Sequence, residues 1–180
     1  MMCHVKITLY FTVLLCTYSL PVFAQNNQAT LFAKEEAFPK VLELNWLNEQ
    51  FLIKQRKRVE TLSRSKLGTP LQTGEQNLPI LQRIINESLI EPEDTEALQA
   101  LGVVLGDAYD AKHRDLEWRV YHDELGKSHA ICVINTKHCL FPITMLSRRI
   151  SAGISPNVDK IFNENFNLLK PHLSRLPFED

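Results

Sequence analysis

Hydrophobic positions change their spacing along the chain, from a helical period in the first half to strict alternation after residue 115. From Pro39, which is favoured in the first turn of a helix, apolar positions repeat every three or four residues to about Leu67, and Gly68 is a typical helix stop. This pattern predicts a long amphipathic helix whose apolar stripe is formed by Leu42, Trp46, Leu47, Phe51, Val59 and Leu62.

Two further helices are expected before residue 112. Leu78 to about Leu89 is a second amphipathic stretch, with Asn77 as its expected N-terminal cap. A third helix begins at the acidic segment 91–96, where Thr95 is a candidate cap, and continues to about Ala111.

Gly102 and Gly106 lie four residues apart and share one face of this third helix. Glycine in a helix interior costs about 1 kcal/mol relative to alanine, so the pair needs a structural reason. We expect another backbone to pack very close to this face, and a surface for ligand approach is the alternative.

The alternation that starts at Leu116 indicates strands rather than helices. Short turn segments separate the apolar runs, which predicts an antiparallel meander in the order strand 116–121, turn 123–127, strand 130–134, turn 135–137, strand 139–141. Folding the strands at these turns sets Trp118 and Cys139 opposite Cys132. The face expected to meet the helices is then Leu116, Trp118, Val120, Ala130, Cys132 and Ile134.

Helical spacing returns over 143–150, which ends in Arg148 and Arg149, and over 159–169, which Pro171 closes. The complete pattern predicts an α+β fold in which a small three-stranded antiparallel meander packs against several helices. We expect a single domain over 39–170, followed by a tail over 171–180.

The first two dozen residues have the features of a cleavable secretory signal peptide. Lys6 provides a positive start, residues 7–20 are mostly apolar, and Ala24 completes a cleavage pattern. The apolar stretch is shorter than the roughly 20 residues that a spanning helix needs. We therefore expect residues 1–24 to be removed, residues 25–38 to form a linker, and the mature chain to be periplasmic or secreted without a transmembrane segment. An uncleaved membrane anchor and a lipid anchor at Cys16 are the alternatives.

Charge and glycine motifs exclude several functional classes. The 180-residue chain has a formal net charge of −1, so no strong field attracts nucleic acid or acidic membranes. Gly102 and Gly106 sit in a helical pattern with no following lysine, so they do not form a phosphate-binding loop. We expect no nucleic-acid partner and no cofactor.

Two cysteines remain after removal of the signal segment. Cys132 and Cys139 are the number expected for one intramolecular disulfide in an oxidising compartment. The loop that they close is short, so the chain-entropy gain is about 2.5 kcal/mol.

The histidines His129 and His138 lie beside these cysteines and raise the alternative of a zinc site. Neighbouring residues in a strand point to opposite faces, and therefore each histidine is expected to point away from its neighbouring cysteine. We expect no metal site.

Polar residues of the first strand and its turn are candidates for acid–base catalysis: Glu117, His122, Asp123 and Glu124. Candidate binding residues are Arg119, Tyr121, Arg148 and Arg149, of which the arginines could hold an anionic substrate. Surface ion pairing is the commoner role of such residues on an exposed strand.

Three stretches together resemble the bacterial family called domain of unknown function 3806: Leu98 to Gly106, Leu116 to Trp118 with Asp123 to Gly126, and Phe141 to Arg149. The resemblance covers roughly residues 46–162. It implies an uncharacterised exported bacterial domain and carries over no catalytic residue or cofactor. The paired cysteines are not part of the family pattern.

The leading hypothesis is a non-catalytic binding or interaction module of the cell envelope, with an unidentified envelope protein or ligand as its partner. Its expected contact surfaces are the open face of the meander, with Tyr121, Ile131 and Val133, and the basic face of the first helix, with Lys54, Arg56, Lys57, Arg58, Arg64 and Lys66. A small envelope hydrolase that uses Glu117, His122 or Asp123 is the competing hypothesis, and a purely structural envelope component is the third.

Overall fold

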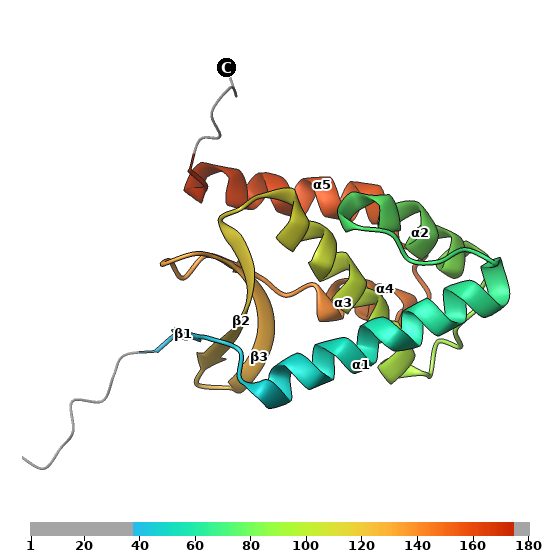
Figure 1. Ribbon diagram of the computed structural model, residues 1–180, viewed down its shortest axis with the longest axis horizontal. Helices are drawn as coiled ribbons and strands as arrows, with labels where there is room; N and C mark the ends of the chain where they lie inside the picture. The colour runs from blue at the N-terminus through green and yellow to red at the C-terminus, as the bar shows by residue number, and fades with distance from the viewer. Residues whose placement is uncertain (1–37, 175–180) are drawn as a thin grey trace, which may run out of the picture. The chain divides into compact units, whose positions relative to one another are not determined.

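Figure 1 shows the computed structural model of the chain, in which residues 38–174 are described. The expected signal peptide, its cleavage site and nearly all of the expected linker lie outside the described residues, as do the last six residues. Within the described part, no helix is both long enough and apolar enough to cross a membrane.

The described residues form an α+β fold, as the sequence pattern predicts. Four antiparallel strands make one sheet in chain order: β1 (Lys40–Leu42), β2 (Leu116–Asp123), β3 (Gly126–Val133) and β4 (Cys139–Leu140). The meander of β2, β3 and β4 is confirmed. A fourth strand, β1, lies beside β2, although the sequence pattern predicts this segment as the start of the first helix.

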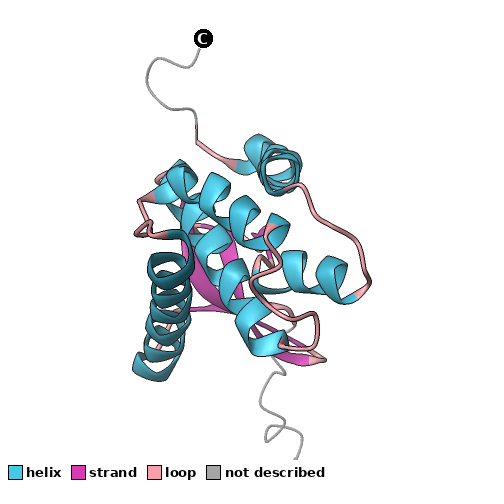
Figure 2. Cartoon of the chain, turned by 90° about the vertical axis from the view of Figure 1, so that its right-hand side faces the viewer, coloured by secondary structure: helices cyan, strands magenta, loops and turns pink. Residues whose placement is uncertain are grey.

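The helices are α1 (Trp46–Leu62), α2 (Leu78–Asn86), α3 (Thr95–Lys112), α4 (Ile143–Ser151) and α5 (Val158–Leu169). They gather on one side of the sheet (Figures 1 and 2). Helix α3 is the central one, because it contacts both the sheet and the helices α1 and α4. Its buried residues include both glycines, because α1, α4 and the sheet all pack against it.

The first helix begins later than the periodicity predicts. The Asn45 side chain accepts a hydrogen bond from the Asn48 backbone N–H at 3.0 Å and caps the helix, so the chain before it is free to extend into β1. The buried face also differs, because Trp46 and Leu47 are 67% and 68% exposed. The residues of α1 and its final turn that turn inward are Leu52, Gln55, Val59 and Ser63.

Two other expected caps do not form. Asp94, rather than Thr95, caps α3 by accepting the Ala97 N–H at 2.9 Å. Asn77 makes no capping bond to α2, because its side-chain amide pairs with both backbone groups of Gln72, at 2.6 and 2.8 Å.

The β2–β3 register differs by one residue from the expected one. Glu124 and Leu125 form a two-residue turn, and the Asp123 carboxylate accepts the Leu125 N–H at 2.9 Å, so Asp123 pairs with Gly126. Trp118 therefore lies opposite Ile131, and Cys132 lies opposite Glu117.

A slip of one residue exchanges the two faces of a strand. The face that meets the helices is Leu116, Trp118, Val120, His129, Ile131 and Val133. The prediction that Ala130, Cys132 and Ile134 belong to this face is wrong, although Ala130 and Cys132 are also buried. The register between Cys132 and Cys139 is as expected, and the two residues form a disulfide with their Cα atoms 4.0 Å apart.

The glycine pair of α3 has the close packing that its sequence predicts. A Cβ atom at Gly102 would lie 2.5 Å from the Cα and carbonyl oxygen of Ile143, so the backbone at the start of α4 occupies that space. A Cβ atom at Gly106 would lie 2.1 Å from the Trp118 ring, so at this position a side chain takes the space instead.

A polar contact joins α1, α3 and β2 beside this packing. The Arg56 guanidinium donates two hydrogen bonds of 2.7 Å to the Asp107 carboxylate, which also accepts the Trp118 indole N–H at 2.9 Å. The carboxylate raises the pKa of Arg56 through this hydrogen bonding. One half-buried carboxylate thus holds three elements together.

Replacement of either glycine by alanine tests this packing. On an open helix face alanine would stabilise by about 1 kcal/mol. For Gly102→Ala and Gly106→Ala we expect the opposite sign, a loss of about 2 kcal/mol in the free energy of unfolding, because the added carbon has no space. Urea denaturation measures this value, and unchanged or increased stability would contradict the packing described.

A double-mutant cycle tests the polar contact. We expect Arg56→Met and Asp107→Asn to show a coupling free energy of about 1 kcal/mol in urea denaturation, because the pair is bidentate and partly buried. The matched control is the exposed pair of Lys160 and Glu164, with 3.9 Å between its charged atoms, for which coupling of at most about 0.5 kcal/mol is expected. Equal coupling in both pairs would show that the contact is no more than a surface ion pair.

Candidate functional site

A cavity of about 430 Å³ lies at the edge of β3, where α1, α3 and the start of α4 approach the sheet. This volume lies within the range of about 300–1,000 Å³ that is usual for ligand pockets. Its walls come from segments far apart in the sequence: Phe51, Gln99, Lys127, Ser128, His129, Phe141, Ile143, Thr144 and Arg148. We call it the β3-edge cavity.

The cavity exists because the chain leaves the sheet early. β4 is only two residues long and pairs with Ile131 and Cys132. Two residues later comes Pro142, which has no N–H to continue the ladder and which lies at the start of α4. The segment 127–130 of β3 is therefore without a neighbouring strand on that side within residues 38–174.

His129 lines the cavity from the face of β3 that meets the helices. Its ring stacks on Phe51 with the ring centres 4.8 Å apart, and its Nε2 atom is 3.0 Å from the Asn48 side-chain oxygen. Burial lowers the pKa of His129 from its ordinary value. The imidazole is therefore uncharged at neutral pH, and the positive charge of the cavity comes from elsewhere.

Lys127 and Arg148 supply that charge, and no carboxylate is among the lining side chains. Neither cation has an ion-pair partner in the described part of the chain, in contrast to Arg56 and Arg119. Ser128, Thr144 and Gln99 add hydroxyl and amide groups that can donate hydrogen bonds. This arrangement can bind an anionic group beside an apolar one.

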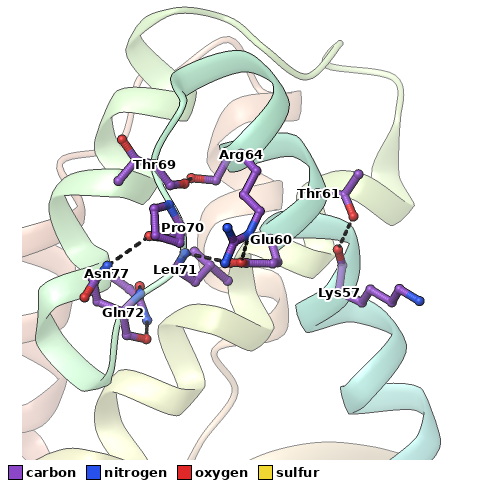
Figure 3. A network of polar contacts seen from close by, with 10 residues as sticks. Lys57, Glu60, Thr61, Arg64, Thr69, Pro70, Leu71, Gln72 and Asn77 are labelled. Atoms are coloured by element: carbon purple, nitrogen blue, oxygen red, sulfur yellow. Dashed lines mark hydrogen bonds and ion pairs between the residues drawn. The ribbon is translucent and has the colours of Figure 1, made fainter.

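A second and more open hollow lies over α1 and the segment before α2, with a volume of about 590 Å³. Several of its polar groups already have partners (Figure 3). Glu60 accepts the Leu71 N–H at 2.6 Å and also pairs with Arg64, and these contacts lower its pKa. Burial raises the pKa of the Asp110 carboxyl nearby, with the charge of Asp107 adding to the rise. We interpret this hollow as structural, because its hydrogen bonds fix the connection between the two helices.

The structure separates the candidate catalytic residues. Glu117 and His122 lie on opposite faces of β2, because their positions differ by an odd number. Glu117 pairs with Arg119, and Asp123 caps the hairpin turn. Glu124 is exposed in the same turn. These four side chains do not converge on one point.

The candidate binding residues divide in the same way. Arg148 lines the β3-edge cavity, whereas the Arg149 guanidinium donates to the Met145 carbonyl at 2.5 Å. Tyr121 packs edge-on against Phe141, with ring centres 5.2 Å apart. Arg119 is bound by Glu117 and Glu43.

Two expected contact surfaces are corrected by the structure. Ile131 and Val133 are buried under the helices, because of the shifted register, and cannot form an open face. Much of the basic face of α1 is paired with acids: Lys54 and Arg58 with Glu96, Arg56 with Asp107, and Arg64 with Glu60.

The histidine and cysteine group does not assemble as ligands. Cys132 and Cys139 are bonded to each other, and His138 stacks on His172 at 3.4 Å between ring centres. Across residues 38–174, no three His, Cys, Asp or Glu side chains are grouped so that they could hold a metal ion.

Sequence reasoning identified Arg148 but missed the cavity around it. Lys127, Ser128 and Thr144 are separated along the chain, and no pattern joins them. The available signal was the short run before Pro142, which shows that the third strand stops before it covers the second one.

The buried histidine leads to a prediction about pH. Because folding lowers the pKa of His129, the unfolded chain binds more protons below the ordinary pKa of 6.5, and stability falls as the pH drops. His129→Phe keeps a ring against Phe51 and removes this titration. We expect the wild type to lose more free energy of unfolding than this variant between about pH 7.5 and about pH 5. Urea denaturation at the two pH values measures the difference, and equal losses would contradict it.

Among solved structures, the fold is similar to that of a crystal structure from Bacteroides thetaiotaomicron, with a TM-score of 0.67 and 14% sequence identity. The similarity covers 74% of this chain and 49% of that one, so this chain spans about half the length of the other protein. At this identity the likeness concerns the fold alone. No curated protein matches the sequence.

The sequence profile of one family matches residues 77–162, from the turn before α2 to the middle of α5. This segment contains all three stretches that carry the resemblance inferred from the sequence, and it ends where that resemblance ends. Residues 77–162 of the chain therefore match the family described as domain of unknown function, DUF3806.

Proposed function

We propose that the protein is a non-catalytic binding module of the cell envelope and that the β3-edge cavity is its ligand site. The observation that carries the proposal is the pair of cations, Lys127 and Arg148, that line this cavity without a carboxylate among its walls. Both side chains are exposed at the rim of the cavity, and two like charges without a nearby carboxylate attract an anion from solution. The ligand is therefore expected to be anionic.

The chemistry of the cavity supports binding over turnover. Its side chains are hydrogen-bond donors, aromatic rings and two cations, and His129 is engaged by Asn48 and stacked on Phe51. General acid–base hydrolysis needs a carboxylate or imidazole that is free to exchange a proton with a substrate. The hydrolase alternative would have to use Glu117, His122 or Asp123, which the sheet holds apart.

An envelope location is part of the proposal, and two features support it. Residues 1–24 have the composition of a signal peptide. The disulfide between Cys132 and Cys139 is of a kind that persists in oxidising compartments and is rare in the cytosol. N-terminal sequencing of the mature protein tests the location, with Gln25 as the expected first residue.

An NMR titration of the mature protein with benzoate tests the site, because this probe joins a carboxylate to a flat apolar ring. We expect amide shifts to concentrate at 127–129 and at Arg148, and Arg148→Gln to weaken binding about tenfold through loss of a charge-assisted hydrogen bond. Arg149→Gln is the matched control, since its guanidinium is bonded to Met145. Equal affinity in the two variants would contradict the proposed site.

Alanine substitutions at Glu117, His122 and Asp123 separate the two classes of function. A binding module tolerates them, with benzoate affinity and cellular phenotype unchanged. A small molecule that accumulates in cells carrying these variants would favour the hydrolase.

A further inference from the structure

The exposed edge of β3 carries backbone groups that are free to pair. The Val133 N–H donates to the His138 carbonyl at 2.9 Å, on the side of β4. Backbone N–H groups of a strand alternate between its two neighbours, so those of Ile131, His129 and Lys127 point to the same side. β4 covers Ile131, and beyond it the N–H and carbonyl groups of His129 and Lys127 have no strand beside them within residues 38–174.

The β3-edge cavity follows this free edge. Successive residues of a strand point to opposite faces, yet Lys127, Ser128 and His129 all line the cavity. A space that runs along the edge of the strand touches all three. The cavity also has apolar walls on each side of the edge, formed by Phe51 and by Phe141. These walls can receive side chains from either face of an added strand.

Charge selects the kind of strand that fits. Lys127 belongs to the edge strand β3, and Arg148 lines the same cavity from α4. No lining side chain is negative. Lysine at a strand edge commonly prevents pairing with another chain, but Arg148 is outside the sheet and has no such role. An occupant with carboxylates would neutralise both cations, whereas a basic segment would be repelled.

From this arrangement we infer that the ligand of the β3-edge cavity is an extended acidic peptide segment of a partner protein, which adds to the sheet as a strand beside Lys127 and His129. This inference rests on the proposed function and names the ligand class. Main-chain hydrogen bonds to the edge supply affinity, and the carboxylates select the peptide through Lys127 and Arg148.

The experiment uses the mature chain and a displayed library of octapeptides with free or blocked C-termini. We expect enriched peptides to contain Asp or Glu, or to depend on a free terminal carboxylate, and the two library forms distinguish these sources. The best binder is then measured by fluorescence anisotropy. Arg148→Gln is expected to weaken it at least tenfold and Arg149→Gln to leave it unchanged.

Backbone methylation of the peptide tests strand pairing separately from charge. Single N-methyl groups are expected to reduce affinity at alternate residues only, because every second N–H of the added strand faces β3. The Lys127 and His129 amides of the protein are expected to gain protection from hydrogen exchange. Methylation without effect, or unchanged exchange at these amides, would overturn the inference.

Other outcomes separate the inference from the proposed function. Benzoate binding without any peptide binder would overturn the peptide and leave the anion site. Failure of both probes would overturn both. If Lys127→Ala gives self-associated protein with unchanged peptide affinity, Lys127 only guards the edge and the inference fails. A peptide that binds only after deletion of residues 25–37 would identify the chain's own segment as the occupant and would also overturn the partner proposed.

Discussion

The contact of Trp118 with α3 is the interaction on which the rest of the structure depends. The indole occupies the space that Gly106 leaves open, and its N–H donates to Asp107 one residue further along. Asp107 in turn holds Arg56 from α1. A side chain at position 106 would push β2 away from α3, and loss of the carboxylate would leave a buried indole N–H and a guanidinium without their partner.

The second glycine of α3 connects this packing to the site. Because Gly102 has no side chain, the backbone at Pro142 and Ile143 approaches α3 closely. The chain must reach this position directly after β4, so it turns away from the sheet after Leu140 and leaves the edge of β3 uncovered. The β3-edge cavity is thus a consequence of helix packing. The disulfide adds to it by attaching β4 to β3 at Cys132, immediately before the chain departs.

Most proteins protect a free strand edge against pairing with another chain. Here the edge is short, it lies between helices, and its backbone is held rigidly by β2 along its other side. A rigid template reduces the entropy that is lost when a strand pairs with it. The similarity at 14% identity to a longer Bacteroides thetaiotaomicron protein shows that this fold tolerates extensive change in sequence.

The sequence by itself determined most of the secondary-structure elements, their order and the disulfide, with β1 as the exception. Periodicity records which face of a local segment is buried, so α2, α3, α5 and the meander were predictable. Gly102 and Gly106 likewise indicated a close contact on one face of α3.

Only the tertiary structure decided the partner of each face. The β2–β3 register depends on a turn of two residues, and an error of one there moved Cys132 and Ile131 to the wrong faces. The exposure of Trp46 and the start of α1 depend on the Asn45 cap and on β1. The β3-edge cavity joins residues from α1, α3, β3 and α4, and no local pattern records contacts between segments so far apart in the chain.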